Sequence, residues 1–194
     1  VLRGMQRIFK TKSPVVIYPS SGTGAWEACL SNVLKAGDQI LFYETGQFAN
    51  LWKQMADRLG IETEFLNGDW RHGVDASRIE QRLRRDTGCS IKAVCCVHHE
   101  TSCGITSDIQ AVRESIDSTG HPALLLVDSI SGLASVDYEH DLWGVDVTVS
   151  GSQKGLMMPP GLGFNALSER AIEVAKKGGS KRSYWDWQDM LNAN

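Results

Sequence analysis

The sequence predicts an α/β fold in which a mostly parallel sheet is covered by helices on both faces. Three observations support this prediction. Short apolar runs alternate with longer segments of 3.6-residue periodicity along most of the 194 residues, a pattern typical of βαβ units. Residues 123–127 (ALLLV) carry no polar side chain, as expected of a central strand with both faces buried. Hydrophobic residues make up 42% and charged residues 22% of the chain, as in folded globular proteins.

The predicted elements follow one another in a regular order. Gly37 follows the predicted helix 23–35, and Gly60 follows the predicted helix 47–59. Glycine commonly ends a helix. Asp75 can cap the predicted helix 75–85, and either Ser107 or Asp108 can cap the predicted helix 108–118. The predicted strands are residues 14–18, 39–43, 61–66, 91–97, 123–127, 145–149 and 163–166. The predicted helices are residues 23–35, 47–59, 75–85, 108–118 and 168–176.

One domain, residues 1–177, is expected to hold all of these elements. The length allows one domain of about 150 residues plus a piece. Residues 178–194 are expected to form a mobile, glycine-rich and charged loop followed by an aromatic-rich tail with no evident partner in the chain. The chain begins with Val rather than Met, so we expect it to be a fragment.

Charge and cysteine pattern argue against several classes of protein. Twenty Lys and Arg against 23 Asp and Glu give a net charge of −3, without the basic surplus of nucleic-acid-binding proteins. No apolar run approaches the roughly 20 residues that cross a bilayer, and the basic N-terminus lacks the apolar centre of a signal peptide. We therefore expect neither nucleic acid nor membrane as a partner. Five unevenly spaced cysteines favour reduced thiols and a cytoplasmic location.

Polar clusters follow several predicted strands, at the sheet edge where α/β proteins bind ligands. Residues 20–24 (SSGTG) lie between a strand and a helix, where free N–H groups and the helix dipole can hold a phosphate. A tight turn with a Ser or Thr cap is an equal alternative. Asp128 ends the buried run 123–127, and a buried carboxylate needs a cationic partner unless it caps the next turn.

Two further clusters contain residues that could react or bind metal. Lys154 follows the strand at 145–149; partial desolvation and nearby cations would make its amine nucleophilic toward a carbonyl, although solvated loop lysines are commoner. Residues 95–103 (CCVHHETSC) invite a zinc interpretation. Adjacent Cys-Cys and His-His pairs on a strand point to opposite faces, and no CxxC or HxxxH spacing occurs, so we expect no metal site.

Together these clusters resemble the large domain of the fold-type I enzymes that use pyridoxal 5'-phosphate (PLP). More narrowly, they resemble the class V aminotransferases of the serine–glyoxylate and alanine–glyoxylate kind. The resemblance runs nearly end to end and rests on the order and spacing of five segments. These are SSGTGAWEA (20–28), HHETSCGI (98–105), PALLLVDSISGLAS (122–135), WGVDVTVSGSQKGLMMPPGLGF (143–164) and YWDWQDML (184–191). GTGAWE, the Asp-Trp pair at 69–70 and GSQKGLMMPPGLGF are most similar to the serine–glyoxylate branch.

The resemblance implies two catalytic residues. Lys154 would form a Schiff base with the PLP aldehyde and later carry a proton between the substrate and the cofactor. Asp128 would pair with the pyridine nitrogen, so that the ring accepts electrons. Gln153 before the lysine also matches the glyoxylate transaminases, because the cysteine desulfurases of the same class have His there.

The remaining implied residues bind the cofactor. Phosphate contacts are expected from Ser21, Gly22, Thr23 and Gln153. Thr101 would lie near the ring hydroxyl. Phe48 would stack on the ring, with Trp52, one turn later, as an alternative.

The implied activity is transfer of the amino group of L-serine to glyoxylate, giving hydroxypyruvate and glycine. The alternatives are alanine–glyoxylate or another class V transamination, a non-catalytic nucleotide- or phosphate-binding module, and an inactive fragment. The resemblance also implies small amino-acid and 2-oxo-acid substrates, a homodimer, and a bacterial cytoplasm or, in a eukaryote, a peroxisome. It further places an N-terminal segment and a C-terminal domain, with the arginine for the substrate carboxylate, outside these residues.

Overall fold

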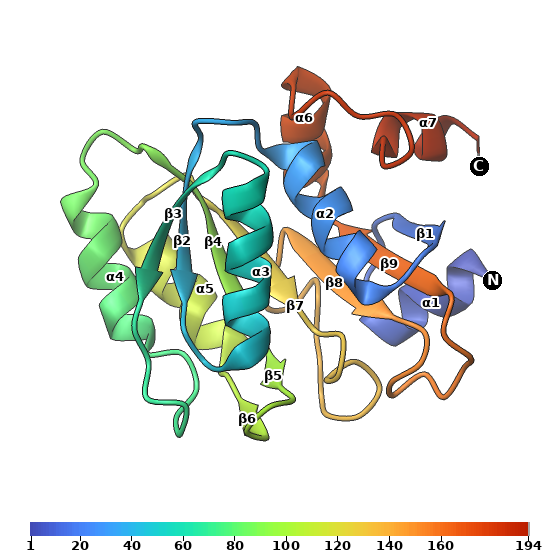
Figure 1. Cartoon of the computed structure of the whole chain (residues 1–194), viewed down its shortest axis with the longest axis horizontal. Coiled ribbons are helices and arrows are strands. Elements are labelled where there is room, and N and C mark those ends of the chain that lie inside the picture. Colours follow the sequence, from blue (N-terminus) through green and yellow to red (C-terminus); the bar gives the residue numbers. More distant parts are fainter. Residues whose placement is uncertain (194) are drawn as a thin grey trace.

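The computed structural model describes residues 1–193 and contains a seven-stranded sheet with strand order β1-β9-β8-β7-β4-β2-β3 (Figure 1). Its strands are β1 (Val15–Pro19), β2 (Gln39–Tyr43), β3 (Glu62–Leu66), β4 (Ile91–Val97), β7 (Leu124–Asp128), β8 (Val147–Gly151) and β9 (Leu162–Leu167). Strands β3, β2, β4, β7 and β8 are parallel to one another, whereas β9 is antiparallel to its neighbours β8 and β1. The predicted mostly parallel sheet is confirmed.

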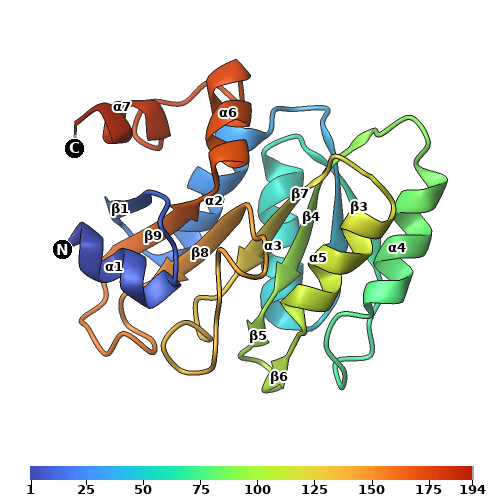
Figure 2. The same ribbon diagram turned by 180° about the vertical axis from the view of Figure 1, so that it is seen from behind.

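Helices cover both faces of the sheet (Figures 1 and 2). The helices are α1 (Leu2–Phe9), α2 (Gly22–Val33), α3 (Gln47–Arg58), α4 (Ala76–Arg85), α5 (Ile109–Ser118), α6 (Glu169–Lys177) and α7 (Trp187–Asn192). Helices α2, α3 and α6 pack on one face, and α1, α4 and α5 pack on the other. Within residues 1–193, no helix is both long and apolar enough to cross a membrane.

The core consists of two apolar clusters, one on each face of the sheet. Successive residues of a strand point to opposite faces. On β7, Leu124 and Leu126 therefore join the cluster under α2, α3 and α6, while Leu125 and Val127 join the cluster under α4 and α5. This two-sided burial explains why the run 123–127 contains no polar residue.

Each predicted strand and helix is present, with bounds within two residues of those predicted. Asp75 and Ser168 cap α4 and α6, and Asp108 rather than Ser107 caps α5, where its side chain accepts a hydrogen bond from the Ala111 N–H. Strand β7 extends to Asp128, so this carboxylate belongs to the strand itself. Helices α1 and α7 and the two-residue strands β5 (His99–Glu100) and β6 (Ile105–Thr106) were not predicted.

The aromatic tail has partners in its own chain, so the expectation that it lacks one is wrong. The side chain of Trp187 is fully buried in the cluster beneath α2. Asn32 on α2 holds the tail twice, donating to the Trp185 carbonyl (2.7 Å) and accepting from the Trp187 N–H (3.1 Å). The Trp185 ring meets the Tyr18 ring edge-on at 5.2 Å. These partners are far away in sequence, so no local pattern could reveal them.

We expect Trp187→Ala to lower the free energy of unfolding by roughly 3 to 5 kcal/mol, as is usual when a buried aromatic side chain is removed. The control is Tyr184→Ala, because the Tyr184 side chain is 55% exposed and its loss is expected to cost less than about 1 kcal/mol. Urea denaturation measures both. Equal effects would show that the tail does not pack as described.

Candidate active site

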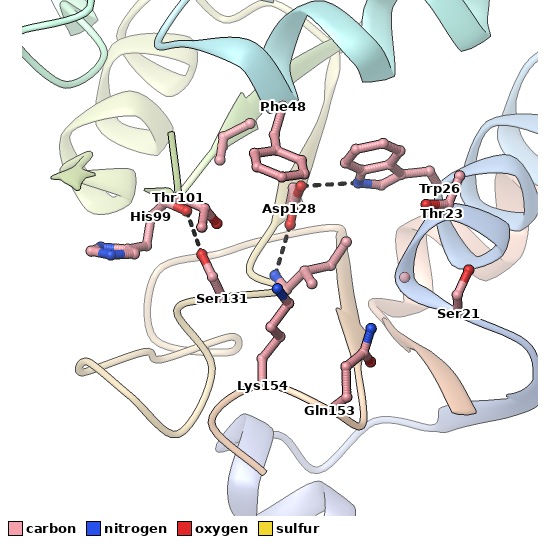
Figure 3. Close-up of a pocket in the computed structure, with 13 residues that line it drawn as sticks. Ser21, Thr23, Trp26, Phe48, His99, Thr101, Asp128, Ser131, Gln153 and Lys154 are labelled. Atoms are coloured by element: carbon pink, nitrogen blue, oxygen red, sulfur yellow. Dashed lines mark hydrogen bonds between the residues drawn. The ribbon is translucent and has the colours of Figure 1, made fainter. Parts of the chain in front are cut away.

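A pocket lies at the carboxyl ends of β4, β7 and β8, beside the first turn of α2 (Figure 3). It brings together all of the residues singled out from the sequence. These are Ser21, Gly22, Thr23, Phe48, Thr101, Asp128, Gln153 and Lys154. They come from segments up to 133 positions apart (154 minus 21) and meet because parallel strands end at one edge of the sheet.

Asp128 lies at the centre of the pocket and is only 3% exposed. Its Oδ1 accepts the Ile130 backbone N–H at 2.7 Å, and its Oδ2 accepts the Trp26 indole N–H at 3.0 Å. Burial raises the pKa of this carboxyl to about 7; the two hydrogen bonds and the nearby Lys154 ammonium lower it, and the negative Glu100 raises it. A cation placed against Asp128 would therefore favour its ionised form.

The first turn of α2 forms a second wall of the pocket. Ser21 is the N-cap, and its Oγ accepts the Gly24 N–H at 3.4 Å. The amides of Gly22 and Thr23 belong to the first turn, where a helix offers its N–H groups no carbonyl partner. This end of the helix also carries a partial positive charge. The turn is therefore suited to an anion such as a phosphate.

Glycines allow β8 and α2 to approach each other at this wall. A Cβ on Gly151, the last residue of β8, would lie 3.3 Å from the Gly22 backbone nitrogen. A Cβ on Gly22 would overlap the Ile130 side chain. A larger residue at position 151 would crowd the start of α2, and one at position 22 would displace the Ile130 side chain.

Lys154 and Gln153 extend from the loop after β8, and both are exposed. The Lys154 side chain reaches toward Asp128 (Figure 3). The loop is anchored by the buried Ser152, whose Oγ donates to the Pro159 carbonyl at 2.7 Å and accepts the Leu162 N–H at 3.2 Å. The lysine thus combines an anchored loop with a long, exposed side chain that lines the pocket.

Phe48, rather than Trp52, is the aromatic residue of α3 that lines the pocket. Trp52 is fully buried behind it and stacks on Trp26. The buried Glu100 positions Phe48, because its Oε1 accepts the Phe48 N–H at 3.2 Å and the Ser102 hydroxyl at 2.7 Å. Glu100 therefore ties the start of α3 to the loop that carries Thr101.

From the sequence, no task in the pocket was assigned to five other lining residues: Trp26, Val97, His99, Ile130 and Ser131. Trp26 could have been found, because it lies four residues after Gly22 and thus on the same face of α2. The others have no local signal. Ser131, for example, closes the pocket by donating its hydroxyl to the His99 carbonyl at 2.7 Å.

The cluster at 95–103 divides between the two faces of the sheet, as predicted. Cys95 and Cys96 point into opposite cores. His98 is buried against the rings of Tyr138 and Trp143, and this burial lowers its pKa to about 4. Within residues 1–193, no three His, Cys, Asp or Glu side chains gather as metal ligands.

We expect Asp128→Asn to change how stability depends on pH. In the folded chain this carboxyl has a pKa of about 7, whereas an unfolded Asp titrates near 4. The folded state therefore binds the proton more tightly, and this stabilising effect is lost as the pH rises from about 4 to 7. Relative to D128N, the unfolding free energy of the unliganded wild-type chain should fall by up to about 4 kcal/mol across this range. Urea titrations at several pH values test this, and a pH-independent difference would contradict it.

Comparisons with known proteins agree with this geometry. Residues 3–190 match the family described as Aminotransferase class-V. The chain is 44% identical over 189 residues to serine–glyoxylate aminotransferase of Methylorubrum extorquens, covering 95% of this chain and 47% of the relative. It is 42% identical over 190 residues to L-aspartate–glyoxylate aminotransferase of Paracoccus denitrificans, covering 97% and 48%.

The fold agrees as well. The crystal structure of an aspartate aminotransferase of subgroup IV from Thermus thermophilus superposes with a TM-score of 0.89 at 30% identity, covering 99% of this chain and 52% of that one. The chain spans about half the length of the curated relatives it matches. The family match over residues 3–190, the similar relatives and the shared fold show that the chain belongs to the class-V aminotransferase family.

Proposed function

We propose that the protein is a PLP-dependent transaminase that moves the amino group of L-serine to glyoxylate, giving hydroxypyruvate and glycine. Residues 1–177 would form its cofactor-binding domain. The observation that carries the proposal is the meeting of Asp128, Lys154 and the first turn of α2 in one pocket. Support for serine as donor comes from the Methylorubrum extorquens relative.

The residues of the pocket fit three parts of PLP: its phosphate, its ring nitrogen and its aldehyde. The amides of the α2 turn suit the phosphate. Asp128 is buried, its carboxylate oxygens accept the neutral Ile130 and Trp26 N–H groups, and burial raises its pKa to about 7. A protonated ring nitrogen would give this carboxylate a cationic partner. Lys154 supplies an amine that reaches the same space from the other side (Figure 3).

Each residue then has a distinct task in the proposed reaction. Bound PLP would supply an aldehyde that takes up amines and a ring that accepts an electron pair. The Asp128 carboxylate would hold the proton on the ring nitrogen. Lys154 would hold the cofactor through Nζ, and the same Nζ would carry the proton from the substrate Cα. Phe48 would line the site on the side of the ring and help to exclude water.

The remaining parts of the proposal concern the whole protein. We propose a homodimer acting on small amino acids and 2-oxo acids. A cytoplasmic location is supported by the cysteines, all five of which are unpaired thiols.

The cofactor and its anchor are tested by adding PLP, reducing with borohydride and mapping the labelled peptide. We expect the label on Lys154, and its loss in Lys154→Ala. Lys176→Ala is the control, because Lys176 is exposed and paired with Glu173 on α6, away from the pocket. A label on another lysine in the full-length protein, or none, would disprove the proposal. Stabilisation by ATP or NAD but not by PLP would instead favour a nucleotide-binding module.

The amino donor is tested with the full-length protein, glyoxylate and a panel of L-serine, L-aspartate and L-alanine. L-aspartate is the second candidate, because the Paracoccus denitrificans relative is nearly as similar to this chain. We expect L-serine to give a kcat/KM at least about tenfold higher than the others, a difference of about 1.4 kcal/mol in transition-state binding. A higher value for L-aspartate would reassign the donor and leave the reaction class intact.

A further inference from the structure

We propose that Trp26 is a positioning residue for this reaction: its indole N–H holds the Asp128 carboxylate as the fixed anionic partner of the cofactor ring nitrogen. This inference rests on the proposed function. It assigns a task to a lining residue to which none was assigned from the sequence.

The contact between Trp26 and Asp128 is direct and long-range. The indole Nε1 lies 3.0 Å from Asp128 Oδ2, in a buried hydrogen bond between residues 102 positions apart. The bond from the Ile130 N–H to Oδ1 is local, two residues along the chain, and an Asp side chain commonly makes such a turn. Trp26 is thus the contact that ties the carboxylate to a different element, α2 (Figure 3).

The indole itself is held rigidly. Trp26 is 3% exposed. Its ring stacks on Trp52 with centroids 5.9 Å apart and an interplanar angle of 14°, and it meets the Phe48 ring at 6.4 Å. Rotating the indole away from Asp128 would break this stack, so the N–H is oriented before any ligand binds.

The chemistry of the indole determines which form of Asp128 it favours. An indole N–H can donate a hydrogen bond but cannot accept one. It therefore pairs well with a carboxylate oxygen and competes with a proton for Oδ2. Because a hydrogen bond to the charged form stabilises that form, Trp26 opposes the burial that favours protonation of Asp128.

Other titratable groups also surround Asp128. Glu100 on β5 adds a negative charge that favours protonation, and the Lys154 ammonium opposes it. The Tyr138 phenol is buried behind the site, where burial raises its pKa and keeps it neutral. His99 lines the pocket wall. Trp26 is the uncharged side chain that donates directly to the carboxylate, so its effect persists when the charged groups are rearranged by substrate.

Trp52 provides a matched control within the same stack. Both indoles are buried, but among residues 1–193 the Trp52 Nε1 has no hydrogen-bond acceptor. Trp26→Phe and Trp52→Phe each keep an aromatic ring and remove one N–H group. Only the first removes a donor to Asp128.

The experiment measures binding of two probes to the full-length protein: PLP, and its analogue in which CH replaces the ring nitrogen. We expect W26F to weaken PLP binding and lower kcat roughly 10- to 100-fold, as for loss of a hydrogen bond to a charged group. Binding of the analogue, which has no ring nitrogen to engage Asp128, should change less than about twofold. W52F should leave the preference for PLP over the analogue unchanged.

A purely structural role predicts a different result. If W26F weakens the binding of both probes equally, or of neither, the inference is overturned.

Should W26F fail to fold, 3-benzothienylalanine at position 26 keeps the shape of the indole and replaces only the N–H by sulfur. The same selective loss of PLP binding is expected. If wild-type protein binds no PLP on Lys154, the proposed function itself fails, whereas normal labelling with an unaltered W26F preference overturns only the role of Trp26.

Discussion

The burial of one carboxylate, Asp128, at the end of the central strand β7 is the constraint on which the pocket depends. A buried charge is costly unless its surroundings stabilise it. Here two N–H donors stabilise the charged form and lower the pKa of the carboxyl, while burial raises that pKa to about 7. The chain thus keeps an acid in a site where a cationic ligand group would complete its pairing. Titratable groups with strongly shifted pKa values cluster at functional sites.

The rest of the pocket is built around that carboxylate by contacts that act on backbones rather than on charges. Gly151 lets the end of β8 meet the start of α2, which brings helix amides next to the strand edge, and Gly22 leaves room for the Ile130 side chain. Glu100 joins the start of α3 to the loop bearing Thr101, so one carboxylate holds both the aromatic wall and the loop. Ser152 fixes the backbone that carries Lys154. The walls are therefore held by hydrogen bonds and close backbone packing, whereas the Lys154 and Gln153 side chains are exposed.

Stability and function make opposing demands on this arrangement. The apolar clusters on the two faces of the sheet provide the favourable burial. The pocket uses part of that stability to keep Asp128 dehydrated, as active sites commonly do. The packing of the tail on α2, through Asn32 and Trp187, strengthens the helix whose first turn forms the anion-binding wall. The C-terminal residues therefore support the site without touching it.

The sequence by itself determined the order of strands and helices along the chain and the two-sided burial of β7. These depend on local patterns: periodicity, capping residues such as Asp75, and an apolar run without polar residues. Local patterns also marked Asp128, Lys154 and the turn at 20–24, whereas the tasks of Phe48, Thr101 and Gln153 were predicted only from the resemblance to a known family. Only the tertiary structure decided that Phe48 rather than Trp52 faces the pocket, that Trp26 bonds to Asp128, and that the tail packs on α2. These features join residues up to 155 positions apart. No local propensity encodes such pairs, because they exist only once the sheet has brought its strand ends and helices together.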